Sequence, residues 1–460
     1  MGTLWKGRFE DSSAKALKAL NDSISIDKRM YLEDIEGSKA HVKMLVSVGL
    51  LEESDGKSVL DALNQTESEM TSGSFVFSED DEDIHTAVER RVTEIAGAAG
   101  ARMHTGRSRN DQVVTDLRLW TLKHLDMLAV LITGLQEVLA EQAEKAGDIR
   151  LPGYTHMQQA QPVLLAHHLL AHGWALSRDF DRIMEVRSRT DVSPLGAGAL
   201  AGSSLPIDPD IAALNLGFSK RFQNSLDAVS DRDFVAETLF VNALIGVHLS
   251  RIGEEIVMWS SEEFSFVEIG DSFTTGSSML PQKKNPDLAE LARGKTGRLI
   301  GYLTGFLATL KGLPLAYNKD LQEDKEPLFD SFDTNKAVLL ALTGMIDSLV
   351  FNSETMKEAA DQPYVVAIDL AEHLVANGLP FREAHELVGG LVKLSLDTGE
   401  TFRNVVAKNK YFESNVDTFF EAGAAIKRRI SPGGTGIEAV KLQKDEFAMR
   451  LEIQLALTNQ

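Results

Sequence analysis

The segment Gly276–Pro286 concentrates chemically active side chains, with hydroxyl, ammonium and amide groups close together in the chain. It has no apolar periodicity, and its prolines fix φ and exclude helix, so it predicts a loop. The small residues Thr274 and Thr275 before it, together with Gly276, would allow this loop to move. A polar surface loop without function is the plain alternative, and composition alone does not separate the two.

A helix is expected to begin directly after this loop. Asn285 is a good N-cap residue, and Pro286 suits the first helical position. Asp287 and Glu290 would place acidic side chains in the first turn. Unpaired backbone N–H groups at this terminus, close to Lys283, would attract an anion.

A second polar segment, Gly153–Pro162, contains a single histidine, His156. It lies between two long helical patterns, which predicts a loop at the end of a helix bundle. A lone imidazole in such a loop can be purely structural or solvated. However, Thr155, Gln158 and Gln161 could orient an imidazole and a carboxylate together, which favours a functional site.

A third segment, His104–Gln112, precedes the first long helical pattern. Arg107 and Arg109 offer planar guanidinium groups that match carboxylates. Asn110 or Asp111 could cap the following helix, and such a cap would explain part of the pattern without any ligand.

Three shorter stretches are ambiguous on their residues alone. Tyr317–Lys325 mixes both signs of charge with an aromatic ring, which suits a zwitterionic ligand but also a plain surface loop. Asp83–His85 has the pattern of a helix start, and Asn21–Asp27 that of a turn.

The loop carries a spaced set of residues: Gly276, Ser277, Ser278, Pro281, Lys283, Asn285 and Pro286. This set resembles the signature of the fumarase/aspartase/argininosuccinate lyase superfamily, and its continuation through Asp287 is similar to the argininosuccinate lyase family. One departure is the order Met279-Leu280, because the family usually has Met immediately before the proline. Exchanging two apolar residues of similar volume should be mild. The other polar segments described above resemble regions of the same family.

The resemblance implies cleavage of argininosuccinate to arginine and fumarate, with no metal and no other cofactor. Loss of a proton from a carbon beside a carboxylate yields a dianionic aci-carboxylate, which the loop N–H groups, Lys283 and Asn285 could stabilise. Our hypothesis is that Ser277 takes this proton. His156, tuned by Glu290 as the resemblance suggests, would then protonate the departing nitrogen. Which of Ser277 and His156 is base and which is acid stays open.

The resemblance also implies substrate-binding positions, namely Ser23, Asp27, His85, Arg109, Asn110, Thr155, Asn285, Tyr317, Gln322 and Lys325. Another superfamily lyase acting on a different C4 diacid, such as adenylosuccinate lyase or fumarase, is the nearest alternative. The Tyr317–Lys325 segment and the continuation of the loop argue against it. A catalytically silent structural relative is a further alternative, because fold does not determine function.

The elements that must position these residues are almost all helical. Five long amphipathic patterns, at about 111–145, 160–188, 230–262, 287–311 and 326–351, predict a bundle. Shorter helices flank them on both sides. We therefore expect an all-α protein with three helical domains, at 1–110, 111–363 and 364–460. Broad apolar faces favour oligomerisation, and the resemblance implies a homotetramer with a shared helical core.

The composition limits the possible partners. The formal charge is −21, from 47 basic and 68 acidic residues, which argues against nucleic acid or an anionic membrane as the main partner. The absence of cysteine excludes disulfides and thiolate chemistry. The start of the chain has no apolar signal region, and no apolar run approaches about 18 residues. A soluble cytoplasmic protein is expected.

Other chemistries fit less well. His168 and His172 have metal-like i, i+4 spacing beside His167, but they lack the glutamate of a zincin motif and a nearby third ligand in the sequence. Gly294-Lys295-Thr296 resembles the end of a phosphate loop, but position 289 is Ala and the pattern is helical. A dinucleotide-binding glycine motif after a strand is also lacking.

Overall fold

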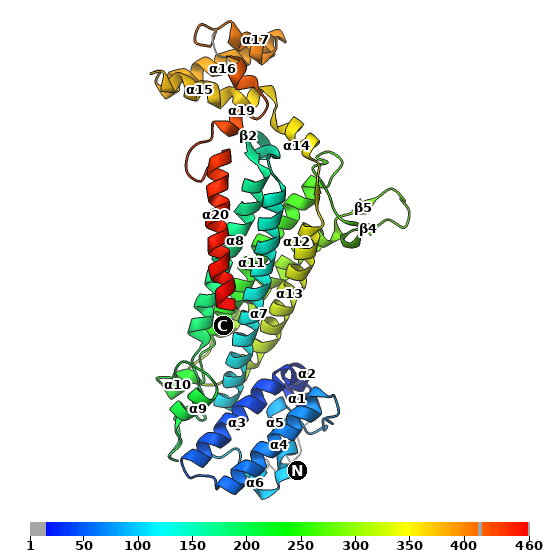
Figure 1. Cartoon of the computed structure of the whole chain (residues 1–460). Coiled ribbons are helices and arrows are strands. Elements are labelled where there is room, and N and C mark those ends of the chain that lie inside the picture. Colours follow the sequence, from blue (N-terminus) through cyan, green and yellow to red (C-terminus); the bar gives the residue numbers. More distant parts are fainter. Residues whose placement is uncertain (1–14, 413–415, 459–460) are drawn as a thin grey trace. The chain divides into compact units, whose positions relative to one another are not determined.

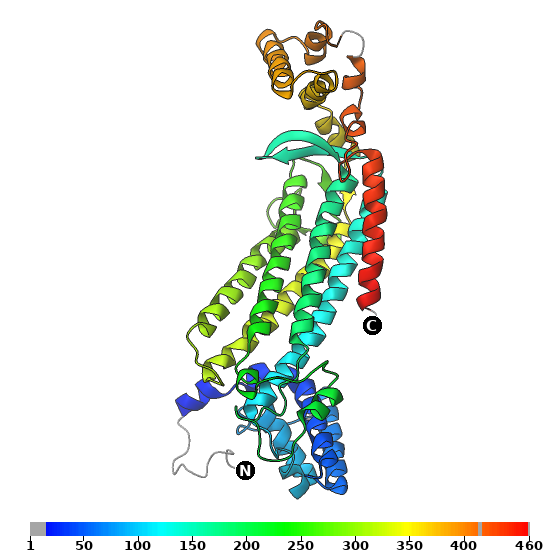
Figure 2. The same cartoon turned by 90° about the vertical axis from the view of Figure 1, so that its left-hand side faces the viewer.

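Helices dominate the computed structural model, which describes residues 15–412 and 416–458 (Figures 1 and 2). Within the described residues, the strands form three separate two-stranded ribbons. The prediction of an all-α fold is thereby confirmed. The chain divides into two compact units, each assembled from several ranges. Unit 1 comprises Met1–Ala129, Asp181–Leu244 and Gly297–Asn335, and unit 2 comprises Val130–Phe180, Ile245–Thr296 and Lys336–Gln460.

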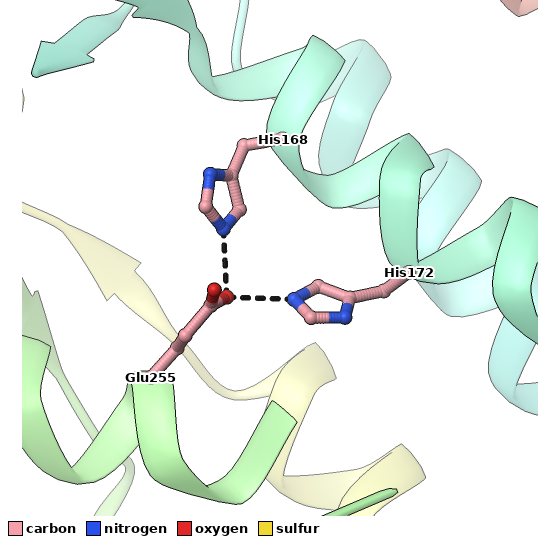
Figure 3. Close-up of side chains that lie close together, drawn as sticks. All are labelled: His168, His172 and Glu255. Atoms are coloured by element: carbon pink, nitrogen blue, oxygen red, sulfur yellow. Dashed lines mark hydrogen bonds and ion pairs between the residues drawn. The ribbon is translucent and has the colours of Figure 1, made fainter. Parts of the chain in front are cut away.

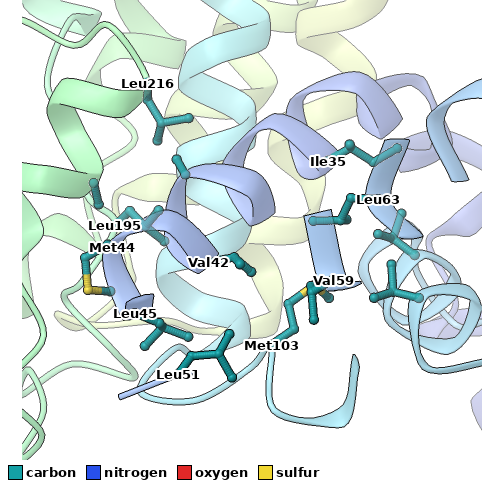
Figure 4. Close-up of a cluster of buried hydrophobic side chains, with 14 of the residues drawn as sticks. Ile35, Val42, Met44, Leu45, Leu51, Val59, Leu63, Met103, Leu195 and Leu216 are labelled. Carbon is teal, nitrogen blue, oxygen red and sulfur yellow. The ribbon is translucent and has the colours of Figure 1, made fainter. Parts of the chain in front are cut away.

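Unit 1 begins with a group of short helices: α1 (Lys15–Asn21), α2 (Ile24–Asp27), η2 (Lys28–Met30), α3 (Tyr31–Ser47), α4 (Glu53–Thr71), α5 (Ile84–Ala96) and α6 (Ala98–Ala101). Their apolar faces meet in a core that includes Ile35, Leu45, Val59 and Leu63 (Figure 4). Helices α3 and α4 pack closely because α4 has Gly56 at the contact. A Cβ at Gly56 would lie 2.4 Å from Cγ2 of Val46.

Two further short helices of unit 1 are α9 (Pro209–Asn215) and α10 (Ser225–Ala228). Leu195, which precedes α9, and Leu216, which directly follows it, belong to the same apolar core as α3 and α4 (Figure 4). The N-cap of α9 is Asp208, whose side chain accepts hydrogen bonds from the backbone N–H groups of Asp210 and Ile211.

The five predicted long helices are present with bounds close to those expected: α7 (Arg109–Lys145), α8 (Leu165–Thr190), α11 (Asp233–Trp259), α12 (Asp287–Leu310) and α13 (Lys325–Asp347). In unit 1 the ring of Trp120 on α7 lies 4.3 Å from that of Phe329 on α13. In unit 2, α11 and α12 approach closely at Gly253, where a Cβ would lie 2.5 Å from the carbonyl oxygen of Ala289. The long helices therefore pack against one another in each unit, as in a bundle.

Helix α11 is more apolar than the sequence analysis anticipated. It has 27 residues, and an 18-residue window within it reaches a mean hydropathy of 1.3, so length and composition alone would allow it to cross a membrane. However, 56% of that window is buried inside the protein. This is the pattern of a core helix in a bundle.

Apart from η4 (Lys319–Asp324) of unit 1, the remaining elements belong to unit 2. The ribbons pair β1 (Arg150–Thr155) with β2 (Gln158–Leu164), β3 (Val267–Glu268) with β6 (Val350–Phe351), and β4 (Thr275–Gly276) with β5 (Lys284–Asn285), all antiparallel. The helices are η3 (Asp271–Phe273), α14 (Ser353–Ala360), η5 (Pro363–Val366), α15 (Ala367–Ala376), α16 (Phe381–Thr398), α17 (Phe402–Ala407), α18 (Asp417–Phe420), α19 (Ala424–Lys427) and α20 (Ile437–Thr458).

The helices from η5 to α18 enclose an apolar core of their own, which includes Leu370, Val388, Phe402 and Phe412. Helix α20 packs instead against α8, where a Cβ at Gly173 would lie 2.7 Å from the ring of Phe447. The predicted division into three domains, with boundaries after residues 110 and 363, stays a prediction.

Candidate active site

The residues proposed from the sequence fall into two groups, one in each unit. Unit 1 carries Ser23, Asp27, His85, Arg109, Asn110, Tyr317, Gln322 and Lys325. Unit 2 carries Thr155, His156, Ser277, Lys283, Asn285 and Glu290.

In unit 1, Ser23 and Asp27 join the short helix α2 to the start of α5. The Ser23 hydroxyl donates to Oδ2 of Asp27 at 2.5 Å, and the backbone N–H of Ile84 donates to Oδ1 at 3.0 Å. Both side chains are buried. Burial raises the pKa of the Asp27 carboxyl, although the nearby His85 and Lys325 oppose this effect. Asp27 is therefore a buried acid held in one orientation.

Arg109 lies at the first turn of α7 and faces the start of α5. Its guanidinium is 3.6 Å from the carboxylate of Asp83 and 3.4 Å from that of Glu89. It also donates to Oε1 of Gln112 at 3.0 Å. Asp83 caps α5 by accepting from the backbone N–H of Thr86 at 2.6 Å. Its capping role was visible in the sequence, but its contact with Arg109 was not.

His85 lies on α5 between two buried carboxylates. Its Nδ1 is 2.7 Å from Oδ1 of Asp34 and 3.3 Å from Oδ2 of Asp116, and all three side chains are at most 2% exposed. Asp34 Oδ1 also accepts from Nε2 of Gln112 at 2.6 Å. Nε2 of His85 is buried and has no hydrogen-bond partner within the described residues. It is therefore the ring nitrogen of His85 that the described residues leave unpaired.

The pKa values of the two carboxyl groups beside His85 are shifted in opposite directions. Burial opposes the ionisation of Asp34, but His85, Arg107 and Arg109 hold its pKa at about 2. Burial and the adjacent Asp34 raise the pKa of Asp116 well above its ordinary value. The environment of Asp34 therefore favours its ionised form, whereas that of Asp116 favours its protonated form.

Asp34, His85 and Asp116 place three potential metal ligands within 4.8 Å of one another. The fit to a cation is poor. The amide nitrogen of Gln112 already donates to Asp34, and the charge of Arg107 acts on both carboxylates. The positive charge of Arg107 opposes a metal ion at this position.

Tyr317, Gln322 and Lys325 lie at the connection between α12 and α13, around η4 (Lys319–Asp324). Nζ of Lys325 is 2.8 Å from Oδ1 of Asp324, whose Oδ2 accepts from Nε of Arg232 at 2.7 Å. This buried Arg232–Asp324–Lys325 chain was not anticipated, because Arg232 is 92 residues from Asp324 along the sequence. Gln322 donates to the backbone oxygen of Asn21 at 3.3 Å, beside α2.

Tyr317 lies close to the same group of charges. Burial, together with Asp324, raises the pKa of its phenol to about 12, and Asp83 and Asp27 act in the same direction. The structure thus brings the segments of α2, α5, α7 and η4 together in unit 1. Asn110 stands apart, because its side chain donates to the backbone oxygen of Ala199 at 2.9 Å. The cluster combines buried carboxylates with cationic groups, as recognition of a ligand with both signs of charge requires.

In unit 2, the segment expected to be a loop between two long helices is a β-hairpin. Thr155 pairs with Gln158 across a two-residue turn formed by His156 and Met157. These residues have φ of 54° and 58°, so both lie in the left-handed region that side chains other than glycine rarely adopt. A two-residue hairpin turn with positive φ at both positions matches the right-handed twist of the flanking strands. His156 is consequently exposed at the tip of the hairpin.

The Gly276–Pro286 segment is a loop with a short ribbon at its base. Strand β4 pairs with β5, so that residues 277–283 project between them. The Ser277 hydroxyl oxygen accepts two backbone hydrogen bonds, from Met279 at 3.2 Å and from Leu280 at 3.0 Å. The ammonium of Lys283 is exposed and has no ion pair within residues 15–412 and 416–458. The loop therefore offers a polarised hydroxyl and a free cation.

The prediction that Asn285 is the N-cap of the following helix is wrong by one position. Asn285 belongs to β5, and α12 begins at Asp287. The Asn285 amide donates to the oxygens of Thr275 and Gly276 at 3.4 Å, across the ribbon. Ribbon pairing thus uses the residue that local sequence preference assigns to a cap. The acidic first turn of α12, with Asp287 and Glu290, is confirmed.

Within the described part of a single chain, His156, Ser277 and Glu290 form no hydrogen bond or ion pair with one another. The proposed tuning of His156 by Glu290 stays a prediction.

Comparisons with known proteins connect this arrangement to a family. A family model described as lyase matches residues 7–301, and one described as argininosuccinate lyase C-terminal matches residues 364–422. The argininosuccinate lyase of Moorella thermoacetica is 49% identical over 442 residues, covering 95% of this chain and 95% of that protein. That of Symbiobacterium thermophilum is 47% identical, covering 96% of this chain and 97% of the relative.

Solved structures of other enzymes have a similar fold. EDDS lyase in complex with formate superimposes with a TM-score of 0.85 at 28% identity, covering 98% of this chain and 92% of that one. The 3-carboxy-cis,cis-muconate lactonizing enzyme of Pseudomonas putida shares the fold, with a TM-score of 0.75 at 21% identity over 96% of this chain and 100% of that one. Because proteins named argininosuccinate lyase are nearly half identical to it over almost its whole length, this chain belongs to the argininosuccinate lyase family of enzymes.

Proposed function

We propose that this enzyme catalyses the reversible β-elimination of argininosuccinate to arginine and fumarate, the last step of arginine biosynthesis. The observation that carries the proposal is the identity of almost half over almost the whole chain with proteins named argininosuccinate lyase. The charged cluster of unit 1 supports it, because argininosuccinate carries several carboxylates and a guanidinium. No metal or other cofactor is part of this proposal.

Ser277 is proposed as the base that removes the proton from the carbon beside a carboxylate. Its hydroxyl oxygen accepts backbone hydrogen bonds from Met279 and Leu280, both of which would stabilise the alkoxide form. The electron pair of the broken C–H bond moves onto the carboxylate and produces an aci-carboxylate dianion. Lys283 and Asn285 are proposed to stabilise this charge.

In the second half of the reaction the C–N bond breaks, and the carbon–carbon double bond of fumarate forms. The departing guanidinium nitrogen must gain a proton at this moment, and His156 is proposed to supply it. The exposed position of His156 at a hairpin tip suits this role, since the imidazole can reach a substrate held elsewhere. General acid and base assistance of this kind accelerates a reaction by about 10²–10⁴-fold.

Substrate recognition is assigned to the unit 1 cluster together with Asn110 and Thr155. Cationic groups, such as those of Arg109 and Lys325, would bind the carboxylates of argininosuccinate. The carboxylate of Asp27 and the phenol of Tyr317 would bind its arginine part. Gln322 and Ser23 would keep these groups in place, and His85 would donate or accept through Nε2.

The loop between β4 and β5 is further proposed to close over the bound substrate and exclude water. Its exposed side chains in the free chain and the small residues at its base support this view. Limited proteolysis would test it: cleavage within residues 277–283 should slow when argininosuccinate is bound. Equal cleavage with and without substrate would show that the loop does not close.

We further propose that the enzyme is a cytoplasmic homotetramer. Its long helices expose large apolar side chains that a bundle of several chains would cover, namely Phe240, Leu291, Ile300, Leu307 and Leu340. In such an assembly, His156 and Ser277 of different copies could serve one substrate. The strongly negative net charge supports small-molecule substrates over nucleic acid or an anionic membrane.

The test is the release of fumarate by the purified protein, monitored by ultraviolet absorbance. Argininosuccinate, adenylosuccinate and malate would be assayed in parallel. Rapid release from argininosuccinate alone is the expected result. Activity on another diacid would keep the chemistry but overturn the substrate, and silence on all three from a folded tetramer would indicate a structural relative.

A further inference from the structure

Two histidines of α8 and a glutamate of α11 converge in unit 2 (Figure 3). The Nε2 atoms of His168 and His172 each lie 2.7 Å from the same carboxylate oxygen, Oε2 of Glu255. Their side chains are 25%, 17% and 30% exposed, so a small ion could reach them from solvent. None of the three belongs to the proposed catalytic or substrate-binding set.

The two helices hold this arrangement in place. The i, i+4 spacing brings His168 and His172 to one face of α8, with ring centres 5.7 Å apart. On α11, Trp259 follows Glu255 by one helical turn, and its ring centre lies 4.8 Å from that of His168. Nearby, Nδ1 of His248 on α11 lies 2.6 Å from Oδ2 of Asp179 on α8. The facing side chains are therefore positioned before any ligand binds.

The donor set has the chemistry of a transition-metal site. Each residue offers one ligand atom, and these atoms lie within 4.8 Å of one another. Two imidazoles and one carboxylate form a common three-residue ligand set for Zn²⁺, which binds such nitrogens and oxygens at about 2.0–2.2 Å.

We propose that His168, His172 and Glu255 bind a divalent transition-metal ion of the zinc class, which links α8 to α11. From the sequence alone, a metal site at these histidines was not favoured, because no third ligand lies nearby in the chain. Glu255, which supplies the third ligand, is 87 residues from His168. Three protein ligands leave at least one coordination position for water. Because the ion binds the folded chain, it stabilises the fold by mass action.

The proposal can be tested on the intact oligomer, stripped of metal with a chelator and dialysed. Titration with Co²⁺ should produce visible absorption bands, with one equivalent bound per chain. Zn²⁺ should displace the Co²⁺, and its affinity would be measured by competition with a chromophoric chelator. Bound Co²⁺ should also quench the fluorescence of Trp259, and this quenching should be lost in W259F.

Matched variants separate a site from adventitious binding. H172A and E255Q each remove one ligand and should weaken binding of Zn²⁺ by at least ~10-fold, since even residues outside the ligand shell contribute this much. H167A is the control, because His167 lies on the same helix but contacts Gln443 at 3.5 Å instead of Glu255. H167A should bind Zn²⁺ as the wild type does.

Two outcomes would overturn the proposal. One is the absence of stoichiometric Co²⁺ binding by the folded wild-type protein. The other is an affinity for Zn²⁺ that H172A and E255Q leave unchanged, which would mean that the three side chains form only a hydrogen-bonded group. E255Q preserves the size of the side chain, so that its result holds even if the alanine variant folds poorly. Fumarate release is measured separately and bears only on the proposed function.

Discussion

Nδ1 of His85 lies 2.7 Å from Oδ1 of Asp34, and both side chains are almost completely buried. This contact orients the imidazole so that Nε2, which has no partner within the described residues, faces away from the carboxylate. The orientation of a proposed substrate-binding histidine thus depends on its contact with Asp34. We propose Asp34 as a positioning residue.

The first prediction concerns stability in Asp34→Asn and Asp116→Asn. Asp34→Asn removes an ionised partner from His85 and the buried Arg107 and should cost about 3–5 kcal/mol of unfolding free energy. The pKa of Asp116 is raised because burial and Asp34 oppose its ionisation, so Asp116→Asn, which removes this unfavourable charge, should cost much less. Urea unfolding at neutral pH compares them. Equal losses would contradict the opposite pKa shifts of the two carboxyl groups.

The same pair predicts a pH dependence. The pKa of Asp34 is lowered from 3.8 to about 2, so its ionisation stabilises the folded state above pH 3.8. That contribution should fall as the pH drops from about 4 towards about 2, and it should be missing in Asp34→Asn. The pKa of Asp116 is raised, so its effect has the opposite sign and destabilises the fold increasingly as the pH rises above 3.8. Thermal unfolding across this pH range measures both effects.

Ser277→Ala should lower kcat by about 10²–10⁴-fold, because the substrate proton loses its acceptor. Thermal stability should not change, since the Ser277 hydroxyl contacts only backbone N–H groups of its own loop. Ser278→Ala is the matched control, because the neighbouring hydroxyl is exposed on the same loop. Steady-state fumarate release measures both variants. Near-normal turnover in Ser277→Ala would remove its role as base.

Substitutions of Lys325 and of Asp324 are expected to have different effects, one on substrate binding and the other on stability. Lys325→Met should raise KM for argininosuccinate while leaving the Arg232–Asp324 pair, at 2.7 Å, intact. Asp324→Asn should leave Arg232 buried without a charged partner and destabilise the fold by about 3–5 kcal/mol. KM and urea unfolding distinguish the two. An unchanged KM in Lys325→Met would contradict its contact with substrate.

The effect of the hairpin turn on stability can be tested separately from the role of the His156 imidazole in catalysis. Met157→Gly should preserve turnover and raise stability by about 1 kcal/mol, since glycine adopts the observed φ of 58° without strain. His156→Asn should also keep the turn, because asparagine tolerates this conformation, yet kcat should fall by about 10²–10⁴-fold. Kinetics and thermal unfolding of both variants test this. Retained activity in His156→Asn would exclude His156 as the acid.

The sequence by itself determined the helices and the family. Apolar spacing is a local property, so the ranges expected for α7, α12 and α13 agree with the structure within a few residues. The capping of α5 by Asp83 follows from the same local logic, in which a short acidic side chain satisfies the first free N–H groups. The signature around Ser277 was also sufficient to indicate the family, which the comparisons confirm.

Only the tertiary structure decided which side chains meet. The contact between Asp34 and His85 spans 51 residues, and that between His168 and Glu255 spans 87. Neither contact can be predicted from the local spacing of apolar residues, because the two side chains meet only when the helices pack. At the hairpin of His156 and at Asn285 the deciding contact is shorter in range, because pairing with the neighbouring strand overrides the preference for a loop or a cap. Backbone propensity acts between near neighbours, whereas burial and charge pairing depend on which surfaces the folded chain brings together.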